Sequence, residues 1–141
     1  MKMDIVKYPD PILNTMCVDA DLTKVETHQL ALDMAYKLIS VGGKGLAAPQ
    51  VGQSIRLFVM KYGDTLIICV NPEITRRGRD KVTNIEKCLS IPGKVFRVTR
   101  SMICDLEFTE LSGTHRKLKL RGIDARYAQH ELDHLNGILI V

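Results

Sequence analysis

The chain has 141 residues, of which 45% are hydrophobic and 26% charged, and 20 Lys+Arg against 16 Asp+Glu give a net charge of +4. This composition indicates one globular domain over residues 1–141 and excludes a disordered, collagen-like or low-complexity chain. The positive balance fits an anionic neighbourhood such as a ribosome, but a solvated surface of mixed charge is the simpler explanation.

The N-terminal residues do not resemble an export signal. Two prolines and two aspartates interrupt the first eleven residues, MKMDIVKYPDP, so they hold no apolar signal core. The longest unbroken apolar run, residues 66–70, is far too short to span a membrane. We therefore expect a cytoplasmic protein whose four cysteines are free thiols: Cys17, Cys69, Cys88 and Cys104.

A helix is predicted near each end of the chain. The first covers residues 23–40, where Thr23 and Glu26 have the spacing of a capping box and two glycines follow the last turn. Its apolar residues recur at helical intervals, as in an amphipathic surface helix: Val25, Leu32, Tyr36 and Ile39. The second helix covers residues 124–135, with Gly137 near its C-terminal cap.

The segments between these helices are predicted to be mostly strands. Residues 43–52, GKGLAAPQVG, are too rich in Gly and Pro for regular structure. Strands are predicted over residues 55–61 and 65–71, and a second hairpin over residues 102–109 and 117–121. Hairpins between two helices indicate an α+β fold, with antiparallel strands around a buried C-terminal helix and the N-terminal helix on the surface.

The sharpest motif is H-E-x-x-H at residues 130–134. On a helix, His130 and His134 share one face and can converge on a single cation, while Glu131 lies about 100° around the helix. Glu131 could then contact a metal-bound water without ligating the metal. The motif also occurs by chance on solvated helices, but the apolar residues around it favour a buried metal site.

A catalytic metal site needs a third protein ligand and an open position. The extended metalloprotease pattern would supply a histidine at position 140, where this sequence has Ile140. We therefore expect the third ligand from upstream. Cys88 lies near a Pro-Gly turn signal and could meet the helix from outside. The other upstream candidates are expected at the surface, in a polar loop or in the core: His28, His115, Cys17, Cys69 and Cys104.

Three separated segments resemble the peptide deformylase family. They are GKGLAAPQ at 43–50, EKCLS at 86–90 and QHELDHLNG at 129–137, against family patterns G-x-G-L-A-A-x-Q, E-G-C-L-S and Q-H-E-x-D-H-L. Their order also matches, and YPDPIL at 8–13 is similar to the family's opening. Lys87 departs from the pattern, which usually has Gly there. The short C-terminus is similar to members that lack a C-terminal extension.

This resemblance implies a metal-dependent hydrolase that removes the N-formyl group from the initiator Met of new polypeptides and releases formate. It implies one divalent metal ion, natively Fe²⁺ with Zn²⁺, Ni²⁺ or Co²⁺ as substitutes, held by three ligands: Cys88, His130 and His134. Glu131 would act as general base and then general acid on metal-bound water. Gln50 and the backbone N–H of Leu89 would stabilise the oxyanion.

The resemblance also suggests how the substrate binds. Gly43 and Gly45 would leave room for a peptide bound as an added strand. Tyr127 is expected either to line the methionine pocket or to pack in the core. Glu86 is expected to pair with an arginine, Arg97 and Arg100 to lie on a solvated edge, and Lys87 to point outward.

Two other functions remain open at this stage. One is an H-E-x-x-H metalloprotease that cleaves internal peptide bonds, and the other is a non-catalytic metal-binding relative that binds nascent chains or ribosomes. The expected partners are formyl-Met nascent peptides and the ribosome surface near the exit tunnel. The sequence holds no nucleic-acid-binding motif, and we expect a monomer.

Overall fold

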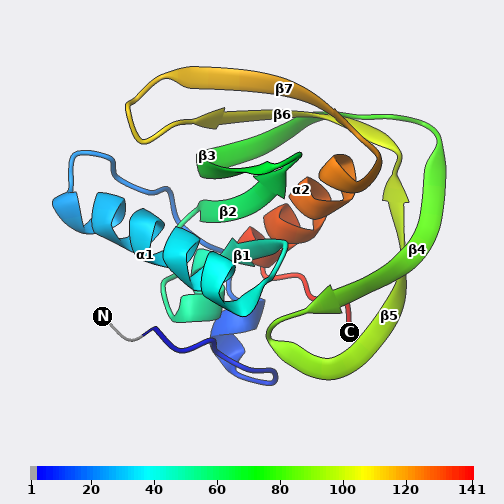
Figure 1. Cartoon of the computed structure of the whole chain (residues 1–141), viewed down its shortest axis with the longest axis horizontal. Helices are drawn as coiled ribbons and strands as arrows, with labels where there is room; N and C mark the ends of the chain where they lie inside the picture. The colour runs from blue at the N-terminus through cyan, green and yellow to red at the C-terminus, as the bar shows by residue number, and fades with distance from the viewer. Residues whose placement is uncertain (1–2) are drawn as a thin grey trace.

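The computed structural model describes residues 3–141. Two α-helices, two short 3₁₀ helices and seven strands follow one another along this part of the chain: 3₁₀ Pro11–Asn14, α1 Val25–Val41, β1 Gly45–Ala47, 3₁₀ Ala48–Val51, β2 Leu57–Tyr62, β3 Thr65–Arg77, β4 Lys81–Cys88, β5 Ile91–Ser101, β6 Ile103–Thr109, β7 His115–Arg121 and α2 Gly122–Leu135. Figure 1 shows α2 running through the middle of the molecule. The expected α+β class is confirmed.

Five strands form one antiparallel sheet in the order β1-β2-β3-β6-β7, and β1 is its edge strand. The two helices cover opposite faces of this sheet. On β2, Phe58 and Met60 pack in the same cluster as the apolar residues of α2, while Leu57 and Val59 pack with α1. Because both faces of β2 are buried, its sequence is a continuous apolar run and not an alternating one.

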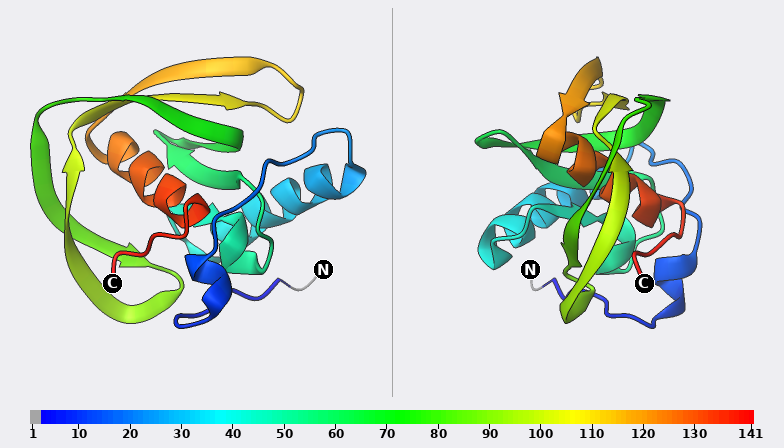
Figure 2. Two further views of the ribbon diagram at one scale, coloured as in Figure 1. Left: turned by 180° about the vertical axis from the view of Figure 1, so that it is seen from behind. Right: turned by 90° about the vertical axis from the view of Figure 1, so that its right-hand side faces the viewer.

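A second, two-stranded sheet is formed by β4 and β5, which pair from Lys81 with Ser101 to Cys88 with Ile91. This hairpin curves around the side of α2 away from the main sheet (Figure 2). Neither strand is predicted from the sequence, because one side of the hairpin faces solvent and its residues show little regular alternation between buried and exposed. The chain turns at residues 89–90, whereas the predicted Pro-Gly turn lies inside β5.

The surface helix α1 is confirmed, but two details of its prediction are wrong. No capping box forms, because Lys24 occupies the N-cap position and the Thr23 hydroxyl donates instead to Asp21 at 2.6 Å. The predicted apolar stripe also faces solvent, with Val25 73% and Tyr36 76% exposed. A second set of residues at helical spacing forms the buried face: Thr27, Ala31, Met34 and Leu38.

Residues 43–52 are more regular than predicted. Gly45–Ala47 form β1, which pairs with β2, and Ala48–Val51 form a 3₁₀ helix. The edge strand is only three residues long, so its Gly-rich sequence carried no strand signal. No helix among the described residues is long and apolar enough to cross a membrane.

The helix α2 ends where Gly137 was predicted to cap it. Gly137 has a φ of +73°, and a Cβ at this position would lie 2.8 Å from the backbone of Asn14. Only glycine fits both the left-handed conformation and this close approach. The contact fixes the C-terminal end of α2 against the first 3₁₀ helix.

Candidate metal centre

Three side chains from two distant segments meet beside α2. Cys88 ends β4, while His130 and His134 project from α2, and one ligand atom of each lies within 4.8 Å of the other two. The Sγ of Cys88 is 3.4 Å from Nε2 of His134. Bond lengths typical of zinc would separate a sulfur and a nitrogen on one tetrahedral ion by about 3.6 Å. The cluster therefore has the spacing of a single metal site.

Glu86 holds one of these histidines in place. Its carboxylate accepts hydrogen bonds from His130 Nδ1 at 2.8 Å, from two nitrogens of Arg100 at 3.0 Å each and from Arg126. Arg100 also pairs with Asp133 at 2.6 Å. Burial alone would raise the pKa of Glu86, but the hydrogen bonds from His130 and Arg100 outweigh it and lower that pKa to about 2. Because the carboxylate can only accept, Nδ1 carries a hydrogen and Nε2 is the atom that faces a metal. Burial alone would lower the pKa of His130, but the hydrogen bonds with Cys88 and Glu86 raise that pKa to about 10, so metal binding at Nε2 would release a proton.

The second histidine fits a metal as well. Burial, together with the nearby His130 and Arg100, lowers the pKa of His134 to about 3, so its ring is neutral at pH 7 and can bind a metal. Its Nδ1 atom and Oε1 of Glu131 are buried side-chain atoms without a hydrogen-bond partner among the described residues. One thiolate and two neutral imidazoles suit a divalent transition metal. The residues present therefore fit the metal that the resemblance implies.

Glu131 lies beside this cluster and is almost fully buried. Burial raises its pKa to about 7, close to the value at which a carboxyl group can both take and return a proton near neutral pH. Gly45 of β1 makes room for it, since a Cβ on Gly45 would overlap the Glu131 carboxylate. A glycine is therefore needed here to leave space for the Glu131 side chain, which is a different reason from the one predicted from the sequence.

Gln50 is buried and points its amide toward the cluster. Its Oε1 accepts from the backbone N–H of Ala47 at 2.9 Å, while its Nε2 lies 3.1 Å from Ser90 Oγ and 3.6 Å from Cys88 Sγ. No hydrogen bond from the backbone N–H of Leu89 is found within residues 3–141. The structure therefore brings both predicted oxyanion donors to the residues around Cys88.

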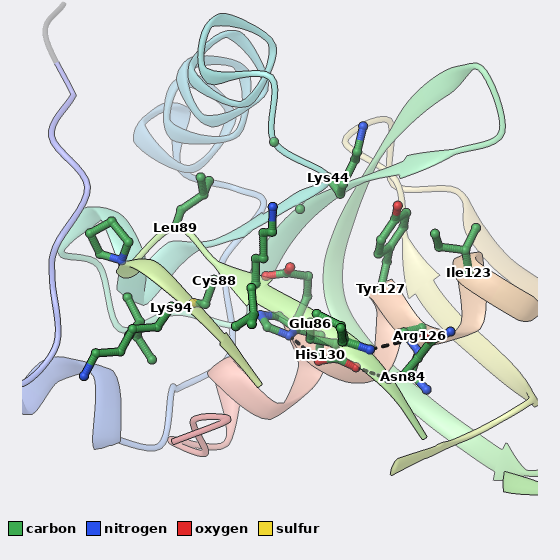
Figure 3. A pocket seen from close by; sticks show the side chains of 18 of the residues that line it. Lys44, Asn84, Glu86, Cys88, Leu89, Lys94, Ile123, Arg126, Tyr127 and His130 are labelled. Atoms are coloured by element: carbon green, nitrogen blue, oxygen red, sulfur yellow. Dashed lines mark hydrogen bonds and ion pairs between the residues drawn. The ribbon is translucent and has the colours of Figure 1, made fainter. Parts of the chain in front are cut away.

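A cavity of about 980 Å³ opens above the cluster (Figure 3). It lies between the free edge of β1 and the end of the β4–β5 hairpin, and the predicted substrate residues Gly43, Gly45 and Tyr127 all line it. Tyr127 also packs against the core, so that expectation is confirmed, and its contact with a methionine side chain stays a prediction. A Cβ on Gly43 would lie 2.8 Å from the side chain of Leu38, so this glycine too relieves a contact within the protein.

The remaining histidines and cysteines lie elsewhere. The structure brings only one group of possible metal ligands together within residues 3–141. His28 Nε2 lies 2.8 Å from the Leu22 carbonyl, and His115 pairs with Glu107 on the surface. The other three cysteines are buried and free: Cys17, Cys69 and Cys104. Of the candidates left open by the sequence, only Cys88 meets the two histidines.

The sequence analysis missed several residues that support the site. Arg126 was not considered, and Arg100 is buried in the ion-pair network, whereas a solvated edge was expected; Arg97 is exposed, as expected. Ser90 holds Gln50. An arginine four residues before a metal-binding histidine has the spacing to share its helix face, which is a signal that could have identified Arg126.

Comparison with known proteins agrees with this geometry. A model of the polypeptide deformylase family matches residues 2–141. The chain is 38% identical to a peptide deformylase of Dictyoglomus thermophilum, over the whole chain and 92% of that protein. It superposes on the crystal structure of a peptide deformylase from Thermotoga maritima with a TM-score of 0.95 and 33% identity, covering 99% of this chain and 95% of the other.

A probable peptide deformylase from Synechococcus phage S-SSM7 is also similar, with a TM-score of 0.92, 34% identity and coverage of 99% and 97% of the two chains. These likenesses extend over the metal cluster, the edge strand and the β4–β5 hairpin alike. The chain therefore belongs to the polypeptide deformylase family.

Proposed function

We propose that the protein removes the N-formyl group from the initiator Met of newly made polypeptides and releases formate. The observation that carries this proposal is the meeting of Cys88, His130 and His134 beside the buried Glu131, in a chain of the deformylase family. The family match over residues 2–141 disfavours both the internal-cleaving protease and the non-catalytic relative. The whole chain would then work as one catalytic domain.

Cys88, His130 and His134 would hold one divalent ion. Such an ion polarises the formyl carbonyl and makes water a better nucleophile near neutral pH. We propose Fe²⁺ as the native metal, with Zn²⁺, Ni²⁺ or Co²⁺ as substitutes, because a thiolate and two imidazoles accept all four. Glu86, Arg100 and Arg126 would keep the His130 ring oriented while metal binds.

Glu131 would move the proton. It would take a proton from the attacking water and deliver it to the leaving amine. The Nε2 amide of Gln50 and the backbone N–H of Leu89 would donate to the oxyanion that develops on the formyl oxygen. Gly43 and Gly45 would present β1 backbone to the peptide, and Tyr127 would contact the Met side chain.

The setting of the reaction follows from this substrate. We place the protein in the cytoplasm, near the ribosome surface where new chains emerge. We also propose a monomer, because a single chain supplies every residue of the cluster and of the cavity. Sedimentation at micromolar concentration would test the monomer, and co-sedimentation with translating ribosomes would test the association.

The central test is a formate-release assay on formyl-Met-Ala-Ser with protein purified without oxygen. We expect about one metal ion per chain and steady release of formate. Glu131→Gln keeps the shape of the side chain but cannot accept a proton, so its rate should fall by about 10²–10⁴ while the metal content stays the same.

Glu107→Gln, at a half-buried surface carboxylate of β6 that does not line the cavity, is the control and should keep the full rate. An unchanged rate in Glu131→Gln would overturn the proton transfer proposed here. Cleavage of an internal peptide bond without formate release would overturn the function itself.

A further inference from the structure

Lysines surround the mouth of the cavity. Lys44 precedes β1, Lys87 lies next to Cys88 at the end of β4, and Lys94 lies on β5; all three line the cavity and are exposed. Figure 3 shows Lys44 and Lys94 extending on opposite sides of the pocket. Lysine side chains therefore lie on both sides of the cavity, one next to β1 and two on the β4–β5 hairpin.

No anion balances these cations at the mouth. Within residues 3–141, the three lysines form no ion pair. The two carboxylates that line the cavity, Glu86 and Glu131, are only 6% and 4% exposed. Glu86 is in addition already paired with Arg100 and Arg126. Among the residues that line this cavity, the accessible charge is thus entirely positive.

A bound peptide would pass these lysines within its first residues. Its reacting end must lie at Cys88 and Glu131, and Lys87 is the direct neighbour of Cys88 in the chain. An extended chain advances about 3.3 Å per residue, so the two residues after the methionine lie within reach of a lysine side chain anchored at the mouth. Gly43 and Lys44 also line a second, smaller cavity, whose charged residues include Lys61 and the exposed Asp64.

We infer that Lys44, Lys87 and Lys94 make this enzyme prefer formyl-Met chains with acidic residues directly after the methionine. The inference rests on the proposed function and adds a substrate preference to it. It also gives Lys87 a role: the residue departs from the family pattern at a point where its charge faces the incoming chain and leaves the metal ligands undisturbed.

The test compares kcat/KM for three amidated peptides, formyl-Met-Glu-Glu, formyl-Met-Gln-Gln and formyl-Met-Lys-Lys. Amidation removes the C-terminal carboxylate that would otherwise add a negative charge to all three. Exposed ion pairs have modest strength, so we expect the acidic peptide about 5-fold above the neutral one and the basic peptide about 5-fold below it. The differences should shrink in 0.5 M NaCl, because salt screens exposed charges.

Variants assign the preference to the cavity. In Lys87→Gln with Lys94→Gln, the acidic-to-neutral ratio of kcat/KM should fall below 2-fold. Lys44→Gln should lower this ratio in part. The matched control is Lys117→Gln with Lys119→Gln, two exposed lysines of β7 that change net charge equally and should keep the 5-fold ratio.

The outcomes separate this inference from the function on which it rests. Equal kcat/KM for the three peptides would overturn the charge preference and leave the deformylase function intact. A preference that is lost equally in the control pair would overturn the assignment to the three cavity lysines. Absence of formate release from all three peptides would overturn the proposed function, and the preference with it.

Discussion

At the scale of single residues, the site depends on buried polar groups that have found the right partners. Glu86 satisfies two arginines and one histidine at once, and Gln50 connects Ala47 with Ser90. Such groups are unfavourable in a protein interior unless they are paired, so each partner is needed for stability as well as for geometry. Substitutions that change one atom or one charge here should therefore have large effects.

Glu86→Gln removes the charge and keeps the shape of the side chain. The variant leaves Arg100 and Arg126 buried without a full counter-charge, so unfolding in urea should show a loss of about 3–5 kcal/mol. Metal affinity should fall by about 10- to 100-fold, because His130 loses its carboxylate partner. Glu107→Gln, at a half-buried surface carboxylate that pairs with His115, should change stability by less than about 1 kcal/mol. Equal effects of the two substitutions would contradict the role given to Glu86.

Gly45→Ala tests the contact between β1 and the proposed proton carrier. The added Cβ must push the Glu131 carboxylate aside, so kcat/KM should drop by about 10²-fold or more while metal content is retained. Gly63→Ala is the comparison variant: a Cβ there meets nothing within 4 Å, although Gly63, unlike Gly45, has a positive φ. It should lose about 1–2 kcal/mol of stability and keep its activity. Full activity of Gly45→Ala would show that Glu131 has room to move.

At the scale of elements, motifs predicted better than periodicity. The H-E-x-x-H spacing located the metal helix because a helix fixes which residues share a face. The β4–β5 hairpin was missed because its two sides face a cavity and solvent, and neither requires a run of apolar residues. On α1, two sets of residues have helical spacing, and only the packing against Leu57 and Val59 decides which of them is buried.

This choice of buried face on α1 can be measured. Met34 is fully buried against the sheet, so Met34→Ala should lower the free energy of unfolding by about 2–5 kcal/mol. Tyr36 is two residues further and exposed, so Tyr36→Ala should change it by less than about 0.5 kcal/mol. Urea denaturation of both variants gives the comparison. A larger loss for Tyr36→Ala would restore the stripe predicted from the sequence.

At the scale of the whole molecule, the metal ligands join parts of the chain that are more than forty residues apart. Cys88 belongs to the hairpin and the two histidines to α2, so a bound ion would tie the small sheet to the central helix. An ion that binds the folded chain and not the unfolded one adds about 4 kcal/mol of stability at a thousand times its Kd. Resemblance of motifs predicted this ligand set, whereas Cys88 could not be placed beside the histidines from periodicity or spacing.

Chelation should therefore lower the melting temperature and release Cys88, the one thiol that lines the cavity, to react with a reagent that enters it. Burial raises the pKa of Cys104 to about 11 and that of Cys69 well above its usual value, and neither should react with a disulfide reagent at pH 8. Cys17, also buried with a raised pKa, should behave in the same way. Thiol counting is expected to give none for the metal-loaded protein, one after chelation and four in denaturant. The Cys88→Ser variant should give none after chelation, and a reactive thiol there would contradict the assignment.

Because the edge strand β1 is short, it can pair with only a few residues of a bound peptide. Three residues of β1 span roughly 10 Å, so backbone pairing with a guest peptide ends after about three residues. Residues of the peptide beyond the first few would therefore make no backbone hydrogen bonds with β1. An enzyme that must accept the first residues of many different proteins can bind more sequences when it contacts so few of their residues.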